Sequence, residues 1–167
     1  MAVREILLYP DPILKTVCTP VAEIDRETDA LVQDLLDTMI DSGHSVGVAA
    51  PQIGVTRRVV VVDVSKSKLG RDNNHGQLVL INPEILEREG QEMTREGCMS
   101  VPDYTGNVTR ASSIVVQFLD RQGQERAIHA DGFEAVAIQH ELDHLDGLLF
   151  LDRVSSLKTD VFRRKTR

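Results

Sequence analysis

Apolar side chains recur at helical spacing in the first quarter of the chain and predict an amphipathic helix. Between residues 25 and 40 they fall three or four positions apart, which places them on one face of a helix. The segment stops at Gly43, a residue type that commonly ends helices. We expect this stripe to pack on the core, and it consists of Leu31, Leu35, Leu36, Met39 and Ile40.

The middle of the chain carries strand patterns. Residues 57–64 are β-branched almost throughout, which favours a strand buried on both faces. Residues 77–81 and 85–89 continue the strand pattern around Asn82-Pro83, and the polar segment 66–76 reads as a surface loop. Residues 112–119 and 125–129 flank a turn-like sequence at 120–123, which predicts a hairpin.

A second helix is predicted near the C-terminus. Asp131 stands where an N-cap would begin it, and Gly147 stands where a left-handed residue would end it. Strands first and a helix afterwards favour an α+β fold with antiparallel sheets.

This second helix carries the most informative motif of the chain, His140-Glu141-Leu142-Asp143-His144. Side chains four residues apart lie on one face of a helix, so two imidazoles at this spacing can bind one metal ion. Glu141 beside them is a candidate proton carrier. Three apolar residues share the same face, so we expect the site at the floor of an apolar pocket; they are Phe133, Val136 and Ala137.

A hydrolytic metal site of this kind uses three protein ligands and leaves a position for water. Metzincin proteases place a third histidine where this chain has Phe150, and thermolysin-like proteases use a later glutamate, whereas no Glu follows Glu141. The third ligand therefore comes from upstream. The candidates are Cys18, Cys98, His44, His75, His129 and various carboxylates.

Cys98 is the favoured candidate because it lies in a short segment of small residues between two strand-like segments, as a loop that presents a thiolate would. Cys18 reads as a small buried apolar residue. We expect His75 to be exposed in the polar loop, and His129 to be structural at the end of a strand.

Three separated motifs together resemble those of bacterial-type peptide deformylases. Residues 140–144 resemble the family's HExDH motif, residues 96–100 (Glu-Gly-Cys-Met-Ser) its EGCLS motif, and residues 45–52 (Ser-Val-Gly-Val-Ala-Ala-Pro-Gln) its GxGLAAPQ motif. Ser45, Val48 and Met99 depart from the family pattern, and none of these changes removes a group that does chemistry. A basic residue often found soon after the second motif is absent from residues 103–107.

The resemblance implies the fold, an α+β domain with antiparallel sheets around a central metal-binding helix, and an activity. That activity is removal of the formyl group from the N-terminal formyl-methionine of new polypeptides, with release of formate. The implied ligands are Cys98, His140 and His144, with Fe(II) as the first expectation and Zn(II) or another divalent metal as the alternative.

The resemblance also implies the roles of other residues. Glu141 would move protons, while the side-chain amide of Gln52 and the backbone N–H of Met99 would stabilise the oxyanion. Gly47 would offer backbone groups to the peptide. The pocket for the methionine side chain would be lined by Val46, Phe133, Val136 and Ala137.

Composition agrees with such an enzyme. The chain has 167 residues, of which 41% are apolar, so we expect residues 1–167 to form a single catalytic domain. A net charge of −7 argues against a DNA-binding protein. The sequence has no export signal, no membrane span and only two cysteines, so we expect a soluble cytoplasmic protein.

Residues 158–167 form a basic C-terminal tail on this acidic chain. It reads either as a solvated chain end or, from the resemblance, as a weak contact with the ribosome. Two other classes of function stay open. A small metallopeptidase would use the same helix motif, and a non-catalytic peptide-binding relative would have lost Glu141 or a ligand, neither of which is missing.

Overall fold

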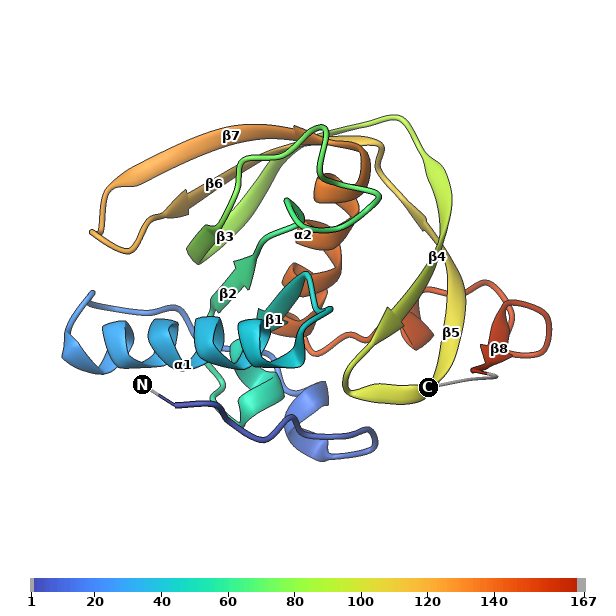
Figure 1. The fold of residues 1–167 in the computed structure, drawn as a ribbon, viewed down its shortest axis with the longest axis horizontal. Helices are drawn as coiled ribbons and strands as arrows, with labels where there is room; N and C mark the ends of the chain where they lie inside the picture. Colours follow the sequence, from blue (N-terminus) through green and yellow to red (C-terminus); the bar gives the residue numbers. More distant parts are fainter. Residues whose placement is uncertain (1, 165–167) are drawn as a thin grey trace.

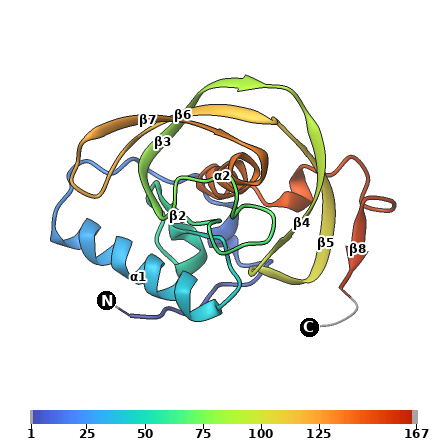
Figure 2. The same ribbon diagram turned by 45° about the horizontal axis from the view of Figure 1, so that its top comes forward.

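The computed structural model describes residues 2–164, and it is an α+β fold in which two antiparallel sheets flank one buried helix. That helix, α2 (Gly132–Leu145), passes through the centre of the molecule, between the two sheets (Figure 1). Viewed from the second direction, α2 is seen nearly end-on, with β3, β6 and β7 arching past one side and β4 and β5 past the other (Figure 2). The predicted fold class is confirmed.

The larger sheet has five strands in the order β1-β2-β3-β6-β7, and each neighbouring pair is antiparallel. The predicted hairpin is present, with Leu119 opposite Glu125. The predicted strand around Asn82-Pro83 is one continuous strand with register shifts, and Asn82 adopts a φ of 51° at the irregularity. The strands are β1 (Gly47–Ala49), β2 (Val59–Val62), β3 (Leu78–Glu89), β6 (Ser113–Leu119) and β7 (Glu125–Asp131).

The smaller sheet has three strands in the order β4-β5-β8, which are β4 (Glu92–Cys98), β5 (Val101–Arg110) and β8 (Val161–Arg163). Cys98 pairs with Val101 at the end of β4, so the segment expected as a loop is a tight two-residue turn of a hairpin. Part of the basic tail is a strand, because β8 pairs with β5. Its last three residues, 165–167, lie outside the described residues.

Strand β2 is buried on both faces, as its run of β-branched residues predicts. Val60 and Val62 belong to the cluster that packs α2 on the sheet, whereas Val59 and Val61 belong to the cluster beneath α1 (Arg26–Ser42). Two helices therefore cover the two faces of this strand, the second in the sheet order.

Helix α1 begins and ends where its local chemistry dictates. The Asp25 carboxylate accepts a hydrogen bond from the backbone N–H of Thr28 at 2.9 Å, and Gly43 ends the helix with a φ of 77°. One expected core residue is wrong, since Ile40 is 63% exposed. Steps of 100° per residue place it at the edge of the buried face, and Val32 takes its place in the core.

Helix α2 starts one residue after Asp131, as expected, but the side chain of Asp131 does not cap it. That carboxylate instead accepts a hydrogen bond from Asn73 in the loop that crosses over it. At the other end Gly147 has a φ of 77°, and a side chain there would meet the backbone carbonyl of Lys15 at 2.6 Å. The chain therefore turns sharply after the helix.

The described part of the chain also has three short 3₁₀ segments, namely η1 (Pro12–Lys15), η2 (Ala50–Ile53) and η3 (Phe150–Asp152). Phe150 is buried in the small cluster beneath β4 and β5, so the residue at the metzincin ligand position is a core residue. Within residues 2–164, no helix is both long enough and apolar enough to cross a membrane.

Candidate metal centre

The predicted ligands come together although they are far apart in the sequence. Cys98 ends β4, while His140 and His144 lie one turn apart on α2, and the candidate ligand atoms of all three lie within 4.8 Å of one another. The Sγ of Cys98 is 3.5 Å from Nε2 of His144. The two imidazole rings are edge to face, with centroids 5.0 Å apart. A thiolate and two imidazoles form a donor set that suits a divalent transition metal.

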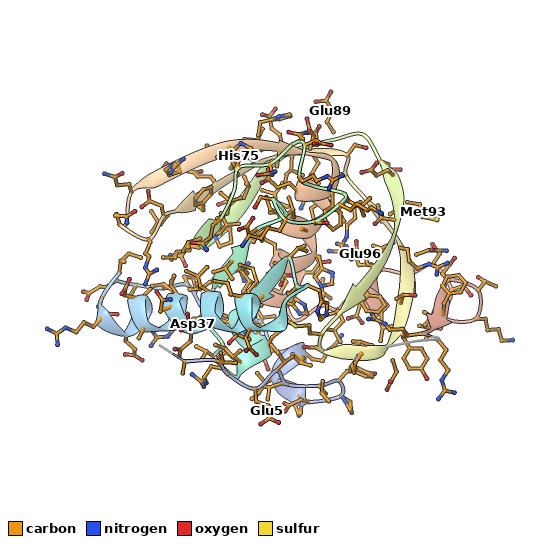
Figure 3. All side chains as sticks on the ribbon, viewed as in Figure 1. Glu5, Asp37, His75, Glu89, Met93 and Glu96 are labelled. Atoms are coloured by element: carbon orange, nitrogen blue, oxygen red, sulfur yellow. The ribbon has the colours of Figure 1, made fainter. Side chains whose placement is uncertain are left out.

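His140 is oriented by a carboxylate on β4. Its Nδ1 donates to Oε1 of Glu96 at 2.8 Å, because an ionised carboxylate can only accept, and this leaves Nε2 for the metal. Glu96 and Cys98 are two residues apart on one strand, so their side chains point the same way. Figure 3 shows Glu96 pointing to the interior, whereas Met93 on the same strand points outward.

Glu96 is held in turn by a buried network of charges. Arg110 on β5 donates to both carboxylate oxygens of Glu96, at 2.7 and 2.9 Å, and to Asp143 of α2 at 2.6 Å. Arg153 also donates to Asp143. Hydrogen bonds and charge from Arg110 and His140 outweigh burial and lower the pKa of Glu96 to about 2. The network ties both strands of the hairpin to the helix that carries the histidines.

The electrostatic surroundings of the three candidate ligands favour a bound cation. Burial works against charge on His140, yet hydrogen bonds to Cys98 and Glu96 raise its pKa well above the usual value. This part of the interior therefore stabilises positive charge. Burial, and then the charge of His140, lowers the pKa of His144, which keeps that ring in the neutral form that binds metals.

Glu141 lies beside this group without belonging to it. Its side chain is buried, and Oε1 has no hydrogen-bond partner among residues 2–164. Burial raises the pKa of Glu141 to about 7, against the opposing charge of His140. A carboxyl group with a pKa near neutrality can both accept and release a proton, and a nearby cation would lower that pKa.

Gln52 approaches the group from η2. Its side-chain oxygen accepts from the N–H of Ala49 at 3.0 Å, which fixes the amide orientation. Its nitrogen donates to Oγ of Ser100 at 3.1 Å and to Sγ of Cys98 at 3.5 Å. Met99 occupies the turn between Cys98 and Ser100.

These groups open into a pocket of about 860 Å³. Its walls come from different elements. Strand β1 and the residues just before it form one wall, and α2 forms another. All of the residues expected to bind substrate line it, namely Val46, Gly47, Phe133, Val136 and Ala137, and so do Gln52, Cys98, Met99, His140 and Glu141. The predicted apolar pocket at the histidine face of α2 is therefore present.

The other candidate ligands lie elsewhere. Cys18 is buried in the main core, and His44 lines the pocket without joining the ligand group. His75 is partly exposed, as expected of its loop, but it also contacts the buried carboxylate of Glu134. His129 is exposed on β7.

The sequence interpretation missed the residues around the ligands. Glu96 and Asp143 stand inside the quoted motifs, and the two-residue spacing from Glu96 to Cys98 on a strand is a signal that would have found the first. Arg110 carries no such local signal, because it is linked to both carboxylates only through the folded chain. Arg95 and Arg164, which also line the pocket, were not singled out.

Comparisons with known proteins agree with this geometry. A family model described as polypeptide deformylase matches residues 3–160. The peptide deformylase of Thermodesulfovibrio yellowstonii is 43% identical over 165 residues, which cover 99% of this chain and 97% of the relative. The peptide deformylase of Xylella fastidiosa strain M12 is 48% identical over 168 residues, with 99% and 95% covered.

A solved structure has the same fold. The crystal structure of peptide deformylase from Ehrlichia chaffeensis in complex with actinonin superposes with a TM-score of 0.88 at 36% identity, and covers 95% of this chain and 92% of that one. Fold, motifs and overall similarity thus agree from one end of the described chain to the other. The chain belongs to the polypeptide deformylase family.

Proposed function

We propose that this chain removes the formyl group from the N-terminal formyl-methionine of newly synthesised polypeptides and releases formate. The observation that carries the proposal is the group of Cys98, His140 and His144, of which Cys98 and His140 line an apolar pocket, with Glu141 beside it, whose Oε1 has no hydrogen-bond partner within residues 2–164. Deformylation of formyl-methionyl peptides is the reaction of the family to which the chain belongs.

Cys98, His140 and His144 would hold the metal. A divalent metal there supplies Lewis-acid chemistry and lowers the pKa of water towards neutrality. The oxygen of a water molecule attacks the formyl carbon while Glu141 accepts its proton. Glu141 then gives a proton to the departing amine as the carbon–nitrogen bond breaks. The products are formate and a free N-terminal methionine.

The oxyanion of this reaction needs hydrogen-bond donors, and the side-chain amide of Gln52 and the backbone N–H of Met99 take that role in the proposal. Ala49 and Ser100 hold the Gln52 amide in one orientation, so its remaining N–H points to Cys98, on the side where the oxyanion would form. Gly47 lines the pocket, where its backbone would pair with the peptide.

The methionine side chain would lie among Val46, Phe133, Val136 and Ala137. These residues supply an apolar lining for a flexible thioether. The residues described, 2–164, would act as one catalytic unit. The larger sheet packs on α2, and the smaller sheet carries Cys98, the metal ligand that faces α2.

Formate release tests the proposal directly. Anaerobically purified chain should release formate from formyl-Met-Ala-Ser and should not cleave the unformylated peptide, as a metallopeptidase would. Glu141→Gln should lose about 10²- to 10⁴-fold in kcat, because a proton carrier is removed. Glu134→Gln is the matched control, because Glu134 is as buried on the same helix but does not line the pocket. Robust deformylation by Glu141→Gln would refute the role given to Glu141.

Fe(II) is the metal we propose, with Zn(II) as the alternative. A single thiolate with two imidazoles accepts both ions, and the resemblance favours iron. Activity should then decay in air and be protected by a reductant. Full activity in air with one zinc ion per chain would exclude iron as a requirement.

We further propose that the protein acts in the cytoplasm on nascent chains, where its two free cysteines stay reduced. Residues 158–167 would make a weak contact with the ribosome, supported by the exposed side chains of Lys158 and Arg163. Co-sedimentation with ribosomes should fall on Lys158→Glu/Arg163→Glu substitution, which leaves β8 in place. Unchanged co-sedimentation of this variant and of a chain lacking residues 165–167 would contradict the contact.

A further inference from the structure

The C-terminal segment brings an arginine into the pocket. Strand β8 pairs with β5, and the backbone N–H of Arg164, the next residue, donates to the carbonyl of Asp103 at 2.8 Å. The side chain of Arg164 lines the pocket. Its guanidinium lies directly against Gly97, where a Cβ would be only 2.5 Å from Nη2. Arg164 therefore stands one residue away from Cys98 along β4.

The guanidinium of Arg164 has an N–H group that lacks an acceptor in the described part of the chain. Its Nε is buried and has no hydrogen-bond partner among residues 2–164, and no carboxylate of the pocket lining is left to pair with it, because Glu96 is held by Arg110 and Glu141 lies beside the histidines. A buried N–H without an acceptor is costly, so the guanidinium would gain a partner by turning towards an acceptor that a ligand brings into the pocket.

A second guanidinium is fixed beside the same strand. Arg95 of β4 stacks on the ring of Phe162 in β8, with 3.8 Å from its central carbon to the ring centroid, and donates to Asn107 at 3.3 Å. Arg95 also lines the pocket. Strand β8 thus leads into one arginine, Arg164, and positions the other through Phe162.

The ionisable side chains of the pocket lining are of two kinds. Glu96 and Glu141 lie with the metal-binding group. The remaining titratable side chains of the lining are His44, Arg95 and Arg164, and all are basic although the whole chain has a net charge of −7. A peptide whose formyl group lies at Cys98 and whose methionine side chain fills the apolar wall would have Arg164, which lies against Gly97, close to its following residues.

We propose that Arg164, with Arg95 beside it, binds the residues that follow formyl-methionine and makes the enzyme prefer an acidic over a basic side chain there. The proposal rests on the function proposed above. The two guanidinium groups donate to the carbonyl oxygens of the second and third residues and to an acidic side chain among them. Neither arginine takes part in the making or breaking of a covalent bond.

The test compares capped peptides that differ in one charge. Formyl-Met-Ala-Glu amide, its Gln and Lys counterparts, and formyl-Met amide are assayed for kcat/KM by formate release. The unaltered chain should prefer the Glu over the Lys peptide about tenfold, and high salt should narrow this ratio. Arg164→Gln should lose about tenfold on the Glu peptide and almost nothing on formyl-Met amide, which does not reach the arginine. Arg164→Glu should invert the preference.

Arg163→Gln is the matched control, because Arg163 is the adjacent, exposed arginine of β8 and does not line the pocket. It should leave every ratio unchanged, and Arg164→Lys should restore part of the preference. Equal rates of the unaltered chain on the Glu and Lys peptides, or an equal loss on formyl-Met amide in Arg164→Gln, would overturn the proposal. Failure to release formate from any substrate would instead overturn the proposed function.

Discussion

The carboxylate of Glu141 packs directly against the α-carbon of Gly47. A Cβ at position 47 would lie 2.7 Å from Oε2 of Glu141 and 2.8 Å from its Cγ. Strand β1 therefore passes the proposed proton carrier at a distance that only glycine permits, and the two sides of the pocket depend on each other here.

Gly47→Ala should therefore displace Glu141. We expect kcat/KM for formyl-Met peptides to fall by about 10²-fold, since a shift of about 1 Å in a catalytic group has effects of that size. The bound metal should remain, because none of its ligands touches Gly47 in this way. Metal analysis and formate release on the same preparation check both parts.

The double variant Gly47→Ala/Glu141→Gln distinguishes displacement of Glu141 from a loss of substrate binding. Once Glu141 is replaced by glutamine, adding Gly47→Ala should cost little more, because both changes act through the same side chain. If instead the two losses multiply, Gly47 acts through its own contacts with the peptide.

Arg110 should be the most important charged residue for stability. It is 5% exposed and lies between two buried carboxylates, Glu96 and Asp143. Arg110→Met leaves both without their main partner, so the free energy of unfolding should fall by about 3 to 5 kcal/mol. Urea unfolding followed by circular dichroism measures it.

Arg153→Met is the control for that prediction. Arg153 also bonds to Asp143, but its side chain is 47% exposed, so water replaces the lost contact and the cost should stay below about 1 kcal/mol. Similar losses for Arg110→Met and Arg153→Met would mean that burial of the network does not determine its contribution.

Glu96 should control metal affinity through His140. Glu96→Gln weakens the acceptor that fixes the ring, and changes to the hydrogen-bond partner of a metal-binding histidine reduce metal affinity about 10- to 100-fold. Competition with a chelator for Zn(II) measures this without an activity assay. Thr94→Val, which removes only long contacts, at 3.4 Å to Glu96 and at 3.5 Å to the carbonyl of Val108, should leave the affinity nearly unchanged.

Cys18 should make stability fall at alkaline pH. Burial raises the pKa of its thiol from 9.0 to about 11, so the unfolded chain loses this proton first as the pH rises. The contribution is complete below pH 9 and is lost between about pH 9 and 11, by at most about 2 to 3 kcal/mol. The stability difference between the unaltered chain and Cys18→Ala, measured in urea, should therefore shrink across this interval. A constant difference would contradict the raised pKa.

Local chemistry explains which features could be predicted from the sequence. Helix α1 and its end at Gly43, the doubly buried strand β2, and the hairpin of β6 and β7 depend on periodicity and turn residues within short windows. The same holds for His140, Glu141 and His144, because four residues make about one helical turn and place both imidazoles on one face.

The direction in which a side chain points depends on more than its neighbours in the sequence. The carboxylate of Asp131 stands at the start of α2 but bonds to Asn73, fifty-eight residues away. Ile40 fits the helical spacing but faces solvent because α1 touches the sheet along a narrower stripe. Rules based on neighbouring residues predict neither the partner of Asp131 nor the exposure of Ile40.

Sequence by itself determined the pair of histidines, the glutamate between them, and the resemblance that named Cys98 as the third ligand. Only the tertiary structure decided that Arg110 joins Glu96 to Asp143, that Gly47 gives room to Glu141, and that the basic tail brings Arg164 into the pocket. Each of these depends on chain segments brought together by the two sheets folding around α2. Contacts across such separations are set by how the core packs, which no short stretch of sequence encodes.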